Sequence, residues 1–139
     1  MMVSGYSKRS LVDKLGIKPG TSVYFEDAPP GYRDELGTLP PGTVVRKRLS
    51  DSLKFIHYFV KSSKQLQAAF PKLKSNLSPS GTLWISWPKG ASKVPTDLNE
   101  NVVRDIGLKN GLVDVKVCAV DDVWSGLKFV YRLKDRPKS

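Results

Sequence analysis

Runs of apolar and β-branched residues, separated by turn residues such as Gly and Pro, predict six β-strands. The run over 53–60 is apolar on both faces, which is typical of a central strand covered on both sides. The remaining runs are shorter or alternate between apolar and polar positions. The expected strands cover residues 21–26, 43–48, 53–60, 82–87, 112–120 and 127–133.

Apolar residues at helical spacing predict helices between these strands. A short helix is expected around 11–15, where Ser7 can cap it and Gly16 can end it. A single helical turn is expected over 32–36, after the first strand.

Two longer helices carry start signals. Ser62 and Gln65 have the spacing of a capping box at the first of them, and Pro71 is expected to kink or divide this helix. Asp97 can cap the second, with Glu100 three residues later as its reciprocal partner.

The order of these elements predicts one α/β domain over residues 1–139, with a frayed tail from 134 to 139. Alternating strands and helices indicate a mostly parallel sheet with helices on both faces. Residues 121–126 join the last two strands and leave no room for a crossover helix. The last pair is therefore expected to be an antiparallel hairpin.

Three segments resemble class I methyltransferases. They are Leu-Gly-Ile-Lys-Pro-Gly at 15–20, Leu-Lys-Ser-Asn-Leu-Ser-Pro-Ser-Gly-Thr-Leu at 73–83 and Trp-Ser-Gly-Leu-Lys at 124–128. The resemblance implies a three-layer, Rossmann-like, six-stranded sheet. Its strand order by chain position would be 2-1-3-4-6-5, with one strand and its helix absent between 48 and 53.

A second resemblance, over nearly the whole chain, is to a bacterial family called domain of unknown function 3052. The segments that carry it are Ser-Trp-Pro-Lys at 86–89, Val-Pro-Thr-Asp-Leu at 94–98, Val-Cys-Ala-Val-Asp at 117–121 and the same 124–128 segment. It implies no particular activity.

The loop after the first strand departs from the methyltransferase pattern. Methyltransferases that bind S-adenosylmethionine (SAM) carry a Gly-x-Gly pattern there, because the backbone must approach the ligand closely. This chain has Glu-Asp-Ala-Pro-Pro-Gly-Tyr at 26–32, with two prolines and one glycine. The second strand ends Arg-Lys-Arg at 46–48, where a ribose-binding acidic residue is expected. The sequence therefore predicts no cofactor, with SAM as the alternative.

The carboxyl ends of the parallel strands are the expected binding rim of such a sheet. Several loops bring carboxylates, a lysine and two tryptophans there, and such a group could bind a small polar ligand. The candidate ligand-binding residues are Asp27, Pro29, Tyr32, Trp87, Lys89, Thr96, Asp97, Asp121, Trp124 and Lys128.

Plainer roles remain open for these side chains. Asp97 suits a helix cap, the two tryptophans suit core packing, and Asp121 suits a turn. His57 lies inside the most apolar strand and is expected to be a packed, hydrogen-bonded histidine. With one histidine and one cysteine the chain lacks the ligands of a zinc site, and no metal is predicted.

The chain is basic, with a formal net charge of +10 and a pI near 9.8. Such a charge favours nucleic acids as partners, but the lysines and arginines are spread from end to end, as on a solubilising surface. No apolar run is long enough to span a membrane. The single cysteine, Cys118, fits the reducing cytoplasm.

These observations favour a cytoplasmic ligand-binding or accessory protein, without methyltransferase activity and with an unidentified small ligand or protein partner. One alternative is a small-substrate enzyme, for example an atypical SAM-dependent methyltransferase. The other is a basic nucleic-acid-binding accessory protein.

Overall fold

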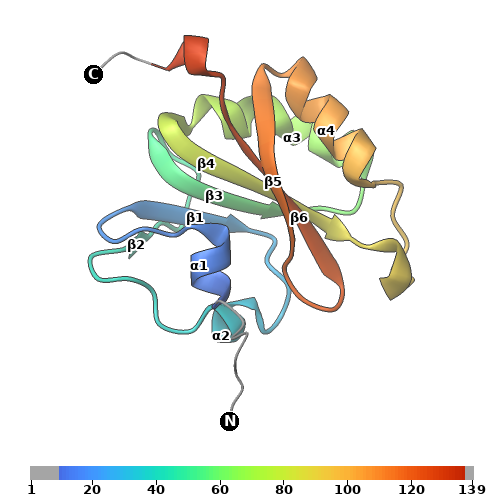
Figure 1. Cartoon of the computed structure of the whole chain (residues 1–139), viewed down its shortest axis with the longest axis horizontal. Helices are drawn as coiled ribbons and strands as arrows, with labels where there is room; N and C mark the ends of the chain where they lie inside the picture. The colour runs from blue at the N-terminus through green and yellow to red at the C-terminus, as the bar shows by residue number, and fades with distance from the viewer. Residues whose placement is uncertain (1–9, 137–139) are drawn as a thin grey trace.

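The computed structural model describes residues 10–136. Its six strands form one sheet in the order β2-β1-β3-β4-β6-β5 (Figure 1). The elements are α1 (Leu11–Leu15), β1 (Ser22–Glu26), α2 (Tyr32–Leu36), β2 (Val44–Val45), β3 (Leu53–Phe59), α3 (Ser63–Ser75), β4 (Leu77–Pro88), η1 (Gly90–Ser92), α4 (Glu100–Lys109), β5 (Leu112–Ala119), β6 (Trp124–Tyr131) and η2 (Leu133–Asp135).

The strand directions follow the predicted pattern. Strands β2, β1, β3 and β4 are parallel, whereas β6 runs antiparallel to both β4 and β5. The predicted sheet order and the C-terminal hairpin are therefore confirmed. No helix among residues 10–136 is long and apolar enough to cross a membrane.

Helices cover both faces of the sheet and divide the core in two (Figure 1). Leu66 and Phe70 of α3, with Val103 of α4, are fully buried in the core on one face. On the other face α1 and α2 cover a second core around Trp84. The indole Nε1 of Trp84 donates to the carbonyl oxygen of Leu15 at 2.8 Å, which fixes α1 against the sheet.

Three strands differ from the predicted ranges by more than one residue at an end. Strand β6 covers Trp124–Tyr131 instead of 127–133, because Trp124 already pairs with Pro88 and Ser125 with Ala119. Strand β2 keeps only two residues, because a parallel edge strand has a single neighbour to pair with. Strand β4 begins at Leu77, five residues early, because Leu77 already pairs with Leu53 across a register shift. The segment expected to be a turn after α3 therefore extends the sheet.

Two helix predictions need correction. The helix expected to kink or divide at Pro71 is not divided: it runs over Ser63–Ser75, and Phe70 and Leu73 on either side of the proline are buried in the core. Asn99, not Asp97, caps α4, and its side-chain oxygen accepts from the Val102 amide at 2.9 Å.

At the chain ends, Ser10 caps α1. Ser7, the cap predicted for this helix, lies outside the described residues. The tail predicted to fray from 134 begins with the 3-10 turn η2, and residues 137–139 also lie outside the described range.

Candidate functional site

The carboxyl ends of β1, β3 and β4 form a rim with two separate hollows. The proline hollow, about 350 Å³, lies between the β1–α2 loop and the β3–α3 loop. The hairpin hollow, about 430 Å³, lies beside the β5–β6 turn. The proline hollow is lined by Asp27, Ala28, Pro29, Pro30, Phe59, Val60, Lys61, Gln65 and Trp124, and the hairpin hollow by Leu11, Lys14, Glu35, Lys89, Ala119, Val120, Asp121 and Asp122.

Tyr32 is buried behind the proline loop rather than presented to a ligand. Gly31, with φ of 89°, turns the chain into α2, and the Tyr32 side chain that follows is only 4% exposed. Its ring packs edge-on against Phe25 and Phe59, with centroids 5.3 and 4.9 Å away. Tyr32 therefore fills the space directly beneath the loop that follows β1.

The Tyr32 hydroxyl joins a buried chain of three polar side chains. It lies 2.7 Å from Nδ1 of His57, whose Nε2 lies 2.7 Å from Oγ of Ser86. His57 and Ser86 are both fully buried, and the His57 ring stacks on Phe59. His57 is thus a packed, hydrogen-bonded histidine, as predicted, and both of its ring nitrogens have partners.

Burial keeps this chain of side chains neutral. It lowers the pKa of His57 to about 3 and raises the pKa of Tyr32, the latter opposed weakly by the charge of Arg33. General acids and bases work best with a pKa near the operating pH. The two hydrogen bonds of the Tyr32–His57–Ser86 chain link α2, β3 and β4 inside the core.

Sequence reasoning did not single out Ser86, although a signal was present. Ser86 is the polar residue inside the apolar stretch 83–87, as His57 is inside 53–60. Two polar residues buried in neighbouring strands are expected to pair, because an unpaired buried polar group is costly.

The two rim tryptophans point to opposite faces of the sheet. Trp87 belongs to the core under α3 and α4, and Trp124 to the core under α1 and α2, where its ring meets Phe59 edge-on at 5.3 Å. Both are buried, at 5% and 8% exposure. Trp124 alone lines a rim hollow, so the two rings do not form a shared stacking surface.

Thr96 and Asp97 brace the rim from behind. Thr96 Oγ1 donates to the Lys61 carbonyl oxygen at 2.6 Å, and the Asp97 carboxylate accepts from the Ser63 amide and hydroxyl at 2.8 and 3.1 Å. Asp97 thereby caps the start of α3 rather than α4. Both residues position the β3–α3 loop that walls the proline hollow.

Lys89 and Asp121 both line the hairpin hollow. The Asp121 carboxylate accepts from the Val123 and Trp124 amides, both at 2.8 Å, and so holds the hairpin turn. The Lys89 amide donates to the Val123 carbonyl oxygen at 2.8 Å. Asp121 therefore has the turn role that its sequence context also allowed.

Lys128 lies away from the rim. It stands opposite Trp84 in the β4–β6 ladder and lines a different hollow, at the other end of the parallel strands. The rim group is therefore smaller than predicted: Asp27, Pro29 and Trp124 share one hollow, and Lys89 and Asp121 share another.

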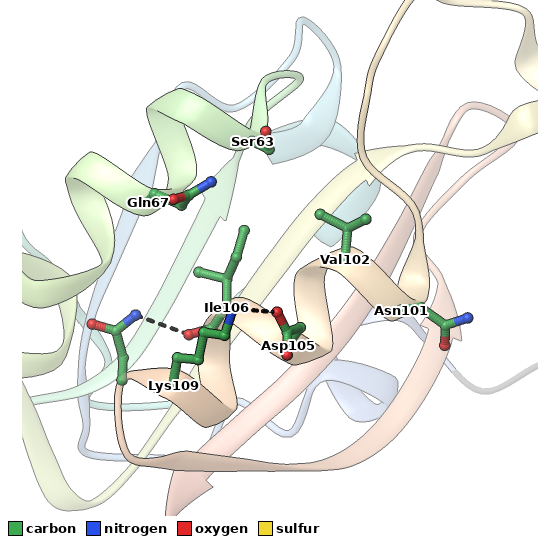
Figure 2. A pocket seen from close by; sticks show the side chains of 8 residues that line it. Ser63, Gln67, Asn101, Val102, Asp105, Ile106 and Lys109 are labelled. Atoms are coloured by element: carbon green, nitrogen blue, oxygen red, sulfur yellow. Dashed lines mark hydrogen bonds and ion pairs between the residues drawn. The ribbon is translucent and has the colours of Figure 1, made fainter.

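A groove of about 510 Å³ lies between α3 and α4, the two helices that cover the face of the sheet opposite α1 and α2 (Figure 2). Figure 2 shows Ser63 and Gln67 of α3 facing Ile106 of α4. An exposed ion pair joins Lys109 to Asp105 at 3.0 Å. None of the predicted site residues lines this groove, and over residues 10–136 no cluster of His, Cys, Asp and Glu could hold a metal ion.

Comparison with known proteins identifies the architecture. No family model matches the chain, and no curated protein matches it in sequence. Solved structures do match. A SAM-dependent methyltransferase from Aquifex aeolicus superimposes with a TM-score of 0.63 at 16% identity, over 86% of both chains. The chain has a methyltransferase-like Rossmann fold.

Two further methyltransferases have the same fold. Magnesium protoporphyrin IX methyltransferase from Synechocystis PCC 6803, with bound SAH, matches with a TM-score of 0.57 at 13% identity, over 87% of this chain and 78% of that one. Ribosomal protein L11 methylase from Lactobacillus delbrueckii subsp. bulgaricus matches with a TM-score of 0.55 at 13% identity, over 88% and 75%. The methyltransferase-like fold is thus established, and the likeness extends to the fold alone.

Proposed function

We propose that this methyltransferase-like domain is a ligand-binding or accessory protein that does not transfer methyl groups. The observation that carries the proposal is the buried Tyr32, which fills the space beneath the loop that follows β1. In Rossmann-like folds this loop must bring its backbone close to the cofactor.

The residues around this loop do not fit SAM. Pro29 and Pro30 lack amide hydrogens, so they remove two backbone donors from the loop. Tyr32 cannot move aside cheaply, since its hydroxyl is held by His57. Beyond β2 the chain presents Lys47 and Arg48 instead of a carboxylate for ribose hydroxyls.

The proline hollow is the favoured ligand site. Phe59 and Trp124 contribute an apolar floor, and Asp27 and Lys61 place opposite charges in the same hollow of about 350 Å³. Pockets for small molecules combine an apolar lining with a few polar groups, at volumes of roughly 300–1,000 Å³. A small zwitterion or nucleoside with one flat or apolar part suits this lining.

NMR titration of the ¹⁵N-labelled chain tests this site with three probes: L-tryptophan, L-lysine and adenosine. We expect at least one probe to shift the amides of loops 27–31 and 60–62 in a saturable manner. Replacing Lys61 by Gln should weaken that binding by roughly fivefold, the value of one exposed charge contact of about 1 kcal/mol.

Asp34→Asn is the matched control, because it removes an exposed charge on α2 outside the proline hollow. It should leave the affinity unchanged. If no probe shifts these two loops, or if the shifts concentrate in the groove between α3 and α4, the proline hollow is not the ligand site.

An atypical SAM-dependent methyltransferase is the second candidate, favoured by the methyltransferases that share the fold. It requires SAM to bind despite Tyr32 and the two prolines. A single measurement therefore separates the two candidates, namely the affinity of the unmodified chain for SAM.

A further inference from the structure

A third hollow, the lysine hollow, lies at the opposite end of the parallel strands from the rim. Its volume is about 500 Å³. Five lysines line it together with one acidic residue, Asp13, so positive charge is in excess even with the aspartate counted. The five are Lys14, Lys18, Lys54, Lys116 and Lys128.

These lysines come from distant parts of the chain. Lys14 lies in the last turn of α1, Lys18 follows that helix, and Lys54 is the second residue of β3. The other two lie on the C-terminal hairpin. Such convergence differs from a solubilising surface, where charges of both signs are interspersed. The fold gathers the five lysines although their spacing along the sequence is wide.

Two of the lysines face each other directly. Lys116 on β5 is the cross-strand partner of Lys128 on β6. Like charges in directly opposed positions destabilise a sheet. The Lys128 ammonium group is also close to the end of α1, since a Cβ built at Gly16 would lie 3.8 Å from its Nζ.

The local electrostatics reflect this crowding. Partial burial lowers the pKa of Lys128, and the charges of Lys116 and Lys18 lower it further. Internal acceptors take up part of the hydrogen-bonding capacity: Lys54 donates to Ser80, and Lys116 Nζ donates to the Lys14 carbonyl oxygen at 3.3 Å. An ammonium group carries three donors, so capacity remains for a ligand.

We propose that the lysine hollow binds a small anion that carries two or more phosphate groups. Lysine binds phosphate as a compact point charge, and a polyphosphate can meet several ammonium groups at once. The site is concave, and its volume lies within the range of small-molecule pockets. A nucleic acid strand would instead need a charged groove that follows its backbone.

Calorimetric titration of the full chain tests the proposal, with inorganic tripolyphosphate and ATP as probes in about 50 mM salt. We expect saturable binding of at least one probe. Tighter binding of ATP than of tripolyphosphate would indicate that the ligand is a nucleotide. Equal affinity for the two probes would indicate that only the phosphate groups are recognised. Lys116→Gln combined with Lys128→Gln should weaken binding by at least about tenfold.

The matched control is Lys47→Gln combined with Lys64→Gln, which removes the same charge from outside the lysine hollow. It should change the affinity less than about twofold. Lys18→Gln is a second variant of the lysine hollow. Lys18 is exposed and lies outside the sheet, and this single substitution should by itself weaken binding of the probe. Without an anion, the Lys116/Lys128 variant should melt no lower than the unmodified chain, since a like-charge pair is removed.

Three results would overturn the proposal. One is no binding of either probe at this salt concentration. Another is equal weakening by the hollow pair and the control pair, which indicates diffuse attraction. The third is binding of single-stranded RNA that exceeds that of both probes and drops equally in the two double variants, which indicates a nucleic-acid surface.

Discussion

Replacing Tyr32 by alanine should lower the free energy of unfolding by about 3–5 kcal/mol, as measured by urea denaturation. The ring is almost fully buried between Phe25 and Phe59, so its removal leaves a cavity. It also leaves Nδ1 of the buried His57 without its partner. One substitution causes both losses, which is why its effect is among the largest expected.

Tyr32→Phe separates the two losses. It keeps the ring and removes the hydroxyl, so it should cost about 1–3 kcal/mol through the unpaired buried nitrogen. Tyr131→Phe is the matched control: its hydroxyl donates to the partly exposed Lys74 carbonyl oxygen at 3.1 Å, and water can replace it. A loss below about 1 kcal/mol for Tyr32→Ala would mean that Tyr32 does not fill this space.

Acidification should destabilise the chain well before its carboxylates are protonated. Burial lowers the pKa of His57 from 6.5 to about 3, so the unfolded chain takes up a proton at higher pH than the folded chain. The stability that neutral His57 contributes is complete above pH 6.5 and is lost as the pH falls toward 3. The loss should reach about 2 kcal/mol near pH 5 and about 4 kcal/mol near pH 3.

Urea denaturation at a series of pH values measures this effect. His57→Gln keeps hydrogen-bonding groups at the position but cannot titrate, so this less stable variant should lose the pH dependence between about pH 7 and pH 5. Asp and Glu remain mostly ionised in that window and contribute little. Equal slopes for the variant and the unmodified chain would contradict the assignment of the pH effect to His57.

Much of the fold could be predicted because its signals are local. The apolar run over 53–60 indicates a central strand, and the short 121–126 connection permits only a hairpin. Helix caps were harder to predict. Asp97 and Asn99 both carry an oxygen that could cap α4. Asn99 caps it because the Asp97 carboxylate instead accepts a hydrogen bond from the amide of Ser63, 34 residues away along the chain.

The candidate site was only partly predictable. The strand pattern predicts which edge of the sheet a residue lies at, but not which face of the sheet its side chain points to. Trp87 and Trp124 reach the same rim and yet point to opposite faces. The lysine hollow was missed because its members are far apart along the chain. A hairpin centred on 121–126 would place Lys116 opposite Tyr131. The observed hairpin turns earlier, with Ala119 opposite Ser125, and this register is what places Lys116 opposite Lys128.

Calorimetric titration of the unmodified chain with SAM tests the central claim most directly. If Tyr32 fills the place beneath the β1 loop, the heats should equal those of dilution, with no saturable binding up to millimolar SAM. Saturable one-to-one binding at micromolar concentrations would contradict the account, because the chain would then bind the methyltransferase cofactor without its glycine loop.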